Sequence, residues 1–402
     1  MKTRARAVLP LIFLLVFLGC QPTRESEAPS ENEITQRDVE KLLALGYVDY
    51  SPEIARPEPV AESLHPESVH PGYTLYVVRG TCQANLIDLT GKIVHSWSAD
   101  PCTYWSNAEL FRNGDLAVTD GKGRLLWFSW NGRTKWKKAL RAHHDQEVTP
   151  DRQIAVLTRG FREIPEISTS HEVEDSVITL LDSSREVVGR LSLYDVLDQN
   201  SIGFRLLDRL VVKKRVDLMH ANSLEWVRPE PGWNTQSGSV HEPGNVLVSV
   251  RHQDTIIVVN WPRQELVWAW GQGEISAPHD ASWLRNGNIL LFDNGVASRR
   301  SRVVEVNPSS REIEWEYSGG EADRFYSAAR GSAQRLPNGN TLVAVSDSGY
   351  AFEVTRDGRI VWKFWNPILN EKNHRATIIR AKRYEKNMVD KLLKRNRSEG
   401  AT

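Results

Sequence analysis

The sequence of 402 residues is poor in cysteine, carries no net charge and has no long apolar run beyond its first nineteen residues. It contains three cysteines, and its 51 basic residues balance its 51 acidic ones. Without an excess of positive charge, the chain lacks the electrostatic footprint of a nucleic-acid-binding protein. No segment after the N-terminus is apolar enough to span a bilayer. A composition that is 40% apolar still allows a large buried core.

The N-terminus is typical of an export signal. Three basic residues precede the apolar run AVLPLIFLLVFLG, which is too short for a membrane-spanning helix. The Gly19-Cys20 junction resembles a bacterial lipobox, although Phe17 stands where leucine is usual. The resemblance implies that residues 1–19 are a signal peptide and that Cys20 carries a lipid. We therefore expect a bacterial envelope protein, periplasm-facing or at the outer membrane, held through that lipid. A plain secretory signal and an uncleaved anchor are the alternatives.

Two cysteines remain after this segment, Cys82 and Cys102. In an exported protein they can form a disulfide, and two reduced buried thiols are the alternative. Neither cysteine stands in a pattern that indicates a metal site.

Residues 20–72 are polar and broken by proline, which is typical of a tether. Within them, the apolar spacing of TQRDVEKLLALG predicts a short amphipathic helix over residues 35–46. The compact domain is predicted to begin at Tyr73.

Two sequence units alternate along residues 73–384. The first is a turn followed by an apolar strand that often ends in tryptophan, and its copies begin at residues 88, 130, 182, 260, 307 and 356. The second is a turn followed by a strand of mixed polarity, as in RNGDLAVTD from 112 and RNGNILLFDNG from 285. Short strands joined by Asn-Gly and Asp-Gly turns favour an all-β radial array. Six copies of the first unit predict a six-bladed β-propeller.

Two segments depart from the repeat. Residues 190–217 have helical spacing and no blade motif, which predicts a helical insertion on one face of the propeller. Such an insertion either covers a pocket or only decorates the surface. At the C-terminus, a strand is predicted to close the last blade before a basic helical tail over residues 385–402.

Histidines recur at the start of the second unit. His279 stands eight residues before Gly287, and His144 stands eight residues before Arg152. MHANSLEWV has the same texture as PHDASWLRN, which assigns His220 to the same position in a third repeat. Equivalent positions of a propeller converge on the central channel, so the three histidines are predicted to form a partial ring.

Several polar residues accompany these histidines. Arginine binds sulfate, phosphate or carboxylate through two parallel hydrogen bonds, and histidine acts as a base, nucleophile or metal ligand. Anion chemistry is favoured over zinc because no carboxylate or cysteine stands at a tight local spacing, and no cofactor is predicted. Ordinary hydrogen-bonding histidines are the alternative, and DNG at 293–295 is also a common turn. The candidate anion- and substrate-binding residues are Arg159, Arg251, Arg302, Asn222, Asp293 and Asn294.

Motifs in the order TLYVVRGTCQANLIDLTGKIVHSW, DLMHANSLEWV, NVLVSVRHQDTIIVVN, APHDASWLRNGNILLFDNG, SRVVEVNP and GSAQRLPNGNTLVAV make residues 73–384 resemble the arylsulfotransferase (ASST) family. The resemblance implies a periplasmic six-bladed propeller. It also implies transfer of a sulfuryl group from a phenolic sulfate ester to a phenol, without the nucleotide donor PAPS, through a sulfohistidine. His220 and His279 match histidines that bind the sulfuryl group. Arg302 matches the arginine that follows the DNG turn.

One departure from the family pattern concerns the nucleophile. The family places its modified histidine in a late blade, where RFYSAARGSAQRLPNGN has none and Gly331 stands at the equivalent position. Another histidine, His279 first and then His220 or His144, accepts the group, or the chemistry differs. The alternatives are a non-catalytic propeller that binds an anionic small molecule or scaffolds an envelope complex, and a hydrolase or lyase of a related anionic substrate.

Overall fold

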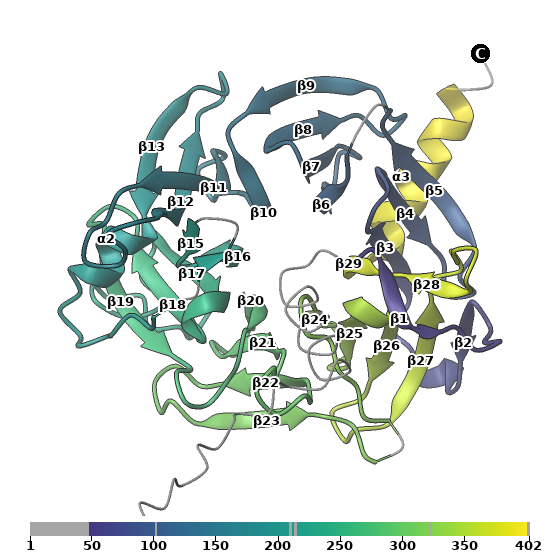
Figure 1. Cartoon of the computed structure of the whole chain (residues 1–402). Helices are drawn as coiled ribbons and strands as arrows, with labels where there is room; N and C mark the ends of the chain where they lie inside the picture. Colours follow the sequence, from purple (N-terminus) through teal and green to yellow (C-terminus); the bar gives the residue numbers. More distant parts are fainter. Residues whose placement is uncertain (1–47, 101–102, 209–210, 213–214, 322, 400–402) are drawn as a thin grey trace, which may run out of the picture. The chain divides into compact units, whose positions relative to one another are not determined.

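The computed structural model describes residues 48–100, 103–208, 211–212, 215–321 and 323–399. Six antiparallel sheets surround a central channel, so the chain is a six-bladed propeller, as the repeats predict (Figure 1). The predicted signal peptide, Cys20 and the helix over residues 35–46 lie outside the described residues. Among the described helices, none has the length and apolar character needed to cross a membrane.

Each blade consists of four strands, and the first strand named here is the innermost. Blade 1 contains β29 (Ile378–Glu385), β3 (Gly72–Val78), β4 (Gln83–Ile87) and β5 (Ile93–Ser98). Blade 2 contains β6 (Trp105–Leu110), β7 (Leu116–Asp120), β8 (Arg124–Phe128) and β9 (Thr134–Ala139). Blade 3 contains β10 (Ala142–Val148), β11 (Ile154–Arg162), β12 (Glu172–Leu181) and β13 (Val187–Ser192).

The second half of the ring follows the same order. Blade 4 contains β16 (Ala221–Trp226), β17 (Asn245–Val250), β18 (Thr255–Asn260) and β19 (Glu265–Trp270). Blade 5 contains β20 (His279–Trp283), β21 (Ile289–Asp293), β22 (Arg302–Val306) and β23 (Ile313–Tyr317). Blade 6 contains β24 (Ser332–Arg335), β25 (Thr341–Val345), β26 (Tyr350–Val354) and β27 (Ile360–Trp365). Short 3-10 helices lie at Pro66–Ser68, Arg251–Gln253 and Ser346–Ser348.

The C-terminal strand closes the ring. β29 pairs with β3, so it completes blade 1; the prediction that this strand closes the last blade was wrong. A single blade therefore joins the two ends of the chain. The helix that follows, α3 (Lys386–Glu399), is more than a solvated tail, because Val389 and Leu392 are buried in the core shared by blades 1 and 2.

Part of the predicted tether is paired with the propeller. β1 (Tyr50–Ile54) pairs with β28 (His374–Ala376), and β2 (Ala61–Ser63) adds a fifth strand to blade 6 along β27. Just before β1, the Val48 carbonyl accepts a hydrogen bond from Arg330, and Asp49 pairs with Arg79 at 3.1 Å. Residues 48–63 are thus a strap along blades 6 and 1.

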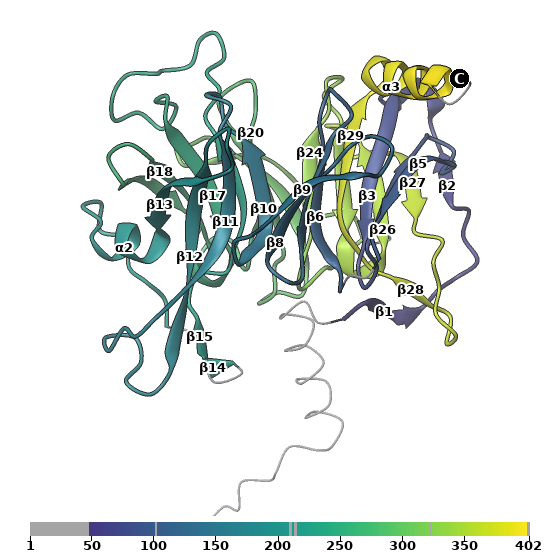
Figure 2. The same cartoon turned by 90° about the horizontal axis from the view of Figure 1, so that it is seen from above.

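The insertion in blade 3 is only partly helical. α2 (Leu193–Asp198) is the one helix in the described part of residues 190–217. It is followed by a hairpin of β14 (Val211–Val212) and β15 (Arg215–Asp217). β15 pairs in parallel with the start of β12, which extends beyond its blade and offers an open edge (Figure 2). This edge, which local spacing does not reveal, explains why a predicted helical segment forms strands.

Hydrogen bonds join the inner edges of neighbouring blades. The backbone N–H groups of Leu224, Ala281 and Ala333 donate to Asp145, Ser223 and Asp280 of the preceding blades, at 3.0–3.1 Å. These contacts satisfy backbone groups that an unpaired strand edge would otherwise leave exposed. They also fix the same register for the inner strands of blades 4, 5 and 6.

Tryptophans join the outer edges. Trp97, Trp270, Trp315 and Trp362 each donate a hydrogen bond from Nε1 to a turn carbonyl of the next blade. The last of these runs from Trp362 of blade 6 to Leu89 of blade 1 at 2.8 Å. We call each of these hydrogen bonds between blades a clasp. The tryptophan repeat therefore reflects these clasps as well as core packing.

We expect Trp362→Phe to lower the free energy of unfolding by about 2–3 kcal/mol, because it removes this clasp and leaves a small cavity. Trp136→Phe is the matched control. Trp136 also stands four residues after a turn glycine, but its Nε1 makes no hydrogen bond to a described residue. Urea unfolding followed by circular dichroism measures both. An equal loss in the two variants would contradict the clasp.

Candidate active site

A cavity of about 560 Å³ lies where the inner strands of the blades meet. The register of the inner strands places one residue from each blade in its wall, and these are Ser106, His144, Asn222, His279, Gly331 and Ile379. Each of them directly precedes the residue at the position of Asp145, Ser223 and Asp280, the side chains that accept hydrogen bonds from the next blade. Irregular pairing at the start of several inner strands turns these side chains toward the channel.

The register corrects the assignment of His220. In blade 4 the position equivalent to His144 and His279 belongs to Asn222, and His220 stands two residues earlier. His220 still lines the cavity, because the chain enters β16 through it. The sequence comparison therefore assigned His220 to a position that Asn222 occupies, although all three histidines line the cavity.

The wall of the cavity is basic. Seven arginine or lysine residues line it, against four aspartate or glutamate residues, so its formal charge is positive by three. The basic residues are Arg79, Lys122, Arg141, Arg159, Arg215, Arg330 and Arg380. The acidic residues are Asp120, Glu174, Asp217 and Asp280. Such a wall favours an anionic ligand.

His279 is held in one tautomer. Its Nδ1 contacts two acceptors, Asn294 Oδ1 at 2.7 Å and the Ala277 carbonyl at 3.1 Å, so Nδ1 carries the proton. The amide of Asn294 is itself fixed, because its Nδ2 donates to the carbonyls of Ser327 and Arg330. Nε2 of His279 therefore keeps its lone pair, and this buried atom has no partner among the described residues.

The ring of His279 is neutral. Burial first, and then the charges of Arg251 and Arg330, lower its pKa to about 3, against opposing hydrogen bonds to Asn294 and the Ala277 carbonyl. Burial also holds the pKa values of His144 and His220 well below the ordinary value, and the charges of Arg251 and Arg159 act in the same direction on both. All three histidines thus present neutral imidazoles to a cationic cavity.

His144 and His220 contact each other directly. Their Nε2 atoms lie 3.2 Å apart, and Nδ1 of His220 lies 2.5 Å from a carboxylate oxygen of Asp217. Asp217 belongs to β15, so the insertion in blade 3 supplies one wall of the cavity. Sequence reasoning missed Asp217, although its spacing of three residues from His220 was available.

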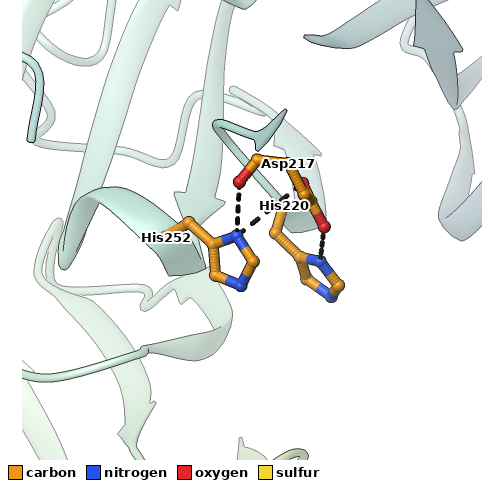
Figure 3. Close-up of side chains that lie close together, drawn as sticks. All are labelled: Asp217, His220 and His252. Carbon is orange, nitrogen blue, oxygen red and sulfur yellow. Dashed lines mark hydrogen bonds and ion pairs between the residues drawn. The ribbon is translucent and has the colours of Figure 1, made fainter. Parts of the chain in front are cut away.

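His252 holds the other side of Asp217 (Figure 3). Its Nδ1 donates to the Asp217 carbonyl at 2.7 Å, and its Nε2 accepts from Arg251 at 2.7 Å. Burial lowers the pKa of His252 to about 3. Arg251 therefore acts behind the cavity wall through His252.

Asp217, His220 and His252 also have the residue types of a metal site, with ligand atoms within 4.8 Å of one another. Hydrogen bonding accounts for their geometry better. The 2.5 Å between Asp217 and His220 is shorter than the roughly 3.3 Å that separates two ligands of a tetrahedral zinc ion. Arg251 also places a cation beside His252.

Four predicted site residues do not line the cavity, namely Arg251, Asp293, Asn294 and Arg302. Arg302 pairs with Asp293 at 2.9 Å and with Glu316 at 2.7 Å, in a separate pocket beside blade 5. Asn294 is fully buried and contacts His279 from behind. The structure thus does not bring Arg302 to the histidines, and it gives Asn294 a positioning contact.

The other predictions are placed as follows. Arg159 lines the cavity and pairs with Glu174 at 2.6 Å, and Asn222 lines it while donating to the Pro278 carbonyl. Cys82 is disulfide-bonded, but Cys102 lies outside the described residues, so their pairing stays a prediction.

A fourth histidine has no room in blade 6. A Cβ atom on Gly331 would lie 2.3 Å from the ring of Phe292. Phe292 is fully buried in the core between blades 5 and 6, so it cannot easily move. The packing around Phe292 therefore leaves no room for a histidine side chain at position 331.

The profile of the arylsulfotransferase (ASST) family matches residues 102–367. The chain belongs to this family. As an arylsulfotransferase family member it departs from the expected pattern at Gly331, where Phe292 fills the space.

Two solved structures are similar to this chain. A protein of unknown function from Bacteroides caccae is 14% identical, with a TM-score of 0.51, over 79% of this chain and 100% of that one. The Cps50 (Swd1) β-propeller domain of Myceliophteria thermophila is 11% identical, with a TM-score of 0.44, over 80% of this chain and 91% of that one. Comparison with curated proteins gave no match.

We expect Gly331→Ala to destabilise the protein by about 1–3 kcal/mol, because the added methyl group overpacks against Phe292. Gly320→Ala is the control, since nothing lies within 4 Å of a Cβ atom there. Thermal unfolding measures both variants. Phe292→Leu should restore part of the loss, and unchanged stability of Gly331→Ala would show that blade 6 can accept a side chain.

Stability should fall as the pH is lowered from about 6.5 to 3. In this window the unfolded chain protonates His279 and the folded chain does not, since its folded pKa is about 3. A histidine of this kind costs up to about 1.4 kcal/mol per pH unit. His279→Gln should therefore flatten the dependence in urea unfolding at pH 7 and 5. His65→Gln, outside the cavity, should keep it, and an equal slope in all three proteins would contradict the assignment.

Proposed function

We propose that this protein transfers a sulfuryl group from a phenolic sulfate ester to a phenol, with Nε2 of His279 as the acceptor. The observation that carries the proposal is the fixed tautomer of His279. Its protonated Nδ1 is held by Asn294, and its unpartnered Nε2 belongs to a residue of the cavity wall. A neutral imidazole with a bare nitrogen is a nucleophile, and a fixed orientation removes the entropy of finding it.

The reaction proceeds in two half-reactions. In the first, the lone pair of His279 Nε2 attacks sulfur, and the sulfur–oxygen bond of the ester breaks so that the phenol leaves with the electron pair. In the second, the oxygen of the acceptor phenol attacks the same sulfur, and the nitrogen–sulfur bond breaks. His279 Nε2 thereby regains its lone pair, and the sulfuryl group leaves on the acceptor.

Arginines supply the charge for these steps. Arg251 and Arg330 lie close enough for their charges to act on His279. Arg330 is held in the cavity wall by Thr377 and by the Val48 carbonyl. Arg330, a fixed cation of the cavity wall, stabilises the charge that develops on the sulfuryl oxygens, while Arg251 acts from behind the wall. The same positive charges keep His279 neutral, so they favour both the binding of an anionic donor and the nucleophilic form of the imidazole.

Aromatic rings in the wall suit the phenolic part of the substrates. Phe161 and Tyr104 line the cavity, and Arg79 lies 3.7 Å from the ring centre of Tyr104. Arg141 and Arg215 lie 5.3 and 4.8 Å from the ring centre of Phe161. These cation–π contacts hold the rings in place beside the cationic wall, where they can contact an aryl group.

We expect His279→Gln to reduce sulfuryl transfer at least 1,000-fold, because it removes the nucleophile. The assay follows phenol release from 4-nitrophenyl sulfate with and without an acceptor phenol. Mass spectrometry of the wild-type protein mixed with donor alone should show one added SO₃ group, lost on adding acceptor. His171→Gln, outside the cavity, should keep full activity.

Other outcomes of this assay would contradict the proposal and indicate a different function. Release that needs no acceptor would indicate a hydrolase. An absence of release together with saturable binding of the donor would indicate a binding protein. Full transfer by His279→Gln would move the nucleophile to another histidine.

A further inference from the structure

A second group of side chains in the cavity has no part in the nucleophilic step. Asp217, His220 and His144 are linked in series by contacts of 2.5 and 3.2 Å. They come from three places in the chain, namely β15 of the insertion, the entry to β16, and β10. All three line the same cavity as His279.

The hydrogen bonds fix the direction of the series. The Asp217 carboxylate accepts the Nδ1 proton of His220, which leaves the Nε2 lone pair of His220 as an acceptor. The contact at 3.2 Å is then a hydrogen bond donated by Nε2–H of His144. Nδ1 of His144 consequently carries a lone pair, and it makes no hydrogen bond in the described part of the chain. The open end of the series is a base.

Two histidines of the series have an unfavourable backbone conformation that the surrounding structure maintains. His144 and His220 adopt φ values of 54° and 46°, a left-handed conformation that non-glycine residues rarely adopt. Conformations of this kind cost of order 1 kcal/mol and persist where the surrounding structure enforces them. Asp217 is secured in turn, because His252 donates to its carbonyl and Arg251 donates to His252.

We propose that Asp217, His220 and His144 form a proton relay that stores the phenolic proton between the two half-reactions, an inference that rests on the sulfuryl transfer proposed above. His144 is the residue that exchanges the proton with substrate. Asp217 and His220 are positioning residues that act through it.

The proton balance of the relay closes over one cycle. When the acceptor phenol attacks, its hydroxyl proton passes to Nδ1 of His144, and the Nε2 proton of His144 moves to Nε2 of His220. His220 is then a transient imidazolium whose charge the Asp217 carboxylate balances, whereas in the free protein burial keeps this ring neutral. When the next donor reacts, both protons move back, and the departing phenolate oxygen takes the proton from Nδ1 of His144. The enzyme gains and loses no net proton.

The dependence on leaving group tests this relay. 4-Nitrophenolate departs without a proton, whereas the more basic phenolate of phenyl sulfate needs one. We expect Asp217→Asn to lower kcat/KM for phenyl sulfate by about 100-fold or more and for 4-nitrophenyl sulfate by less than about threefold. A merely structural role for Asp217 would lower both by the same factor, and that result would overturn the relay.

Two further variants keep the test decisive. His144→Gln, in a different blade, should give the same selective loss, and it replaces Asp217→Asn should that variant fail to fold. Asp195→Asn is the matched control. Asp195 is a carboxylate of the same insertion, and it pairs with Arg162 outside the cavity. It should leave the kcat/KM values for both donors unchanged.

The remaining outcomes also discriminate. Transfer that EDTA abolishes and added Zn²⁺ restores would overturn the relay and assign Asp217 and its histidines to a metal. Transfer by the wild type with an equal loss for both donors in the variants would remove the relay while leaving sulfuryl transfer intact. A wild-type protein that transfers from neither donor would overturn both proposals.

Discussion

The unpaired inner edge of each blade is the constraint on which the rest of the molecule depends. An open strand edge exposes backbone N–H groups, and here side chains such as Asp145, Ser223 and Asp280 accept them across the blade boundary. The acceptors must stand at the same position in successive blades. The residues directly before them are therefore also brought to one level of the channel, where the cavity lies.

Electrostatics and burial have a common effect in this cavity. A buried imidazole resists protonation, and neighbouring arginines make protonation still less favourable, so the histidines stay neutral while the wall stays positive. A wall of carboxylates would have the opposite effect, because it would draw protons onto the rings and repel an anion. The excess of three positive charges thus favours anion binding and also keeps the imidazoles neutral.

Much of the fold could be predicted from the sequence, because turns and alternating strands are local signals. The repeats predicted the six blades that the structure shows. The site was harder to predict. His144 and His279 were found because both stand eight residues before the same turn position. His220 was misplaced by two residues, because the irregular pairing at the start of β16 cannot be seen by counting residues. Asp217 and the strands around it depend on an open edge of β12, which lies more than forty residues away in the sequence. Arg302 was taken from the resemblance, and the ion pairs with Asp293 and Glu316 that hold it elsewhere are tertiary contacts.

The strap at the start of the described chain has a mechanical consequence. Val48 and Asp49 contact Arg330 and Arg79, two guanidinium groups of the cavity wall, and the strand that follows is pinned to β28. Tension applied to the chain ahead of residue 48 would pass to those two side chains before it reached β1. A shift of residues 48 and 49 would therefore change the position of two guanidinium groups of the cavity wall.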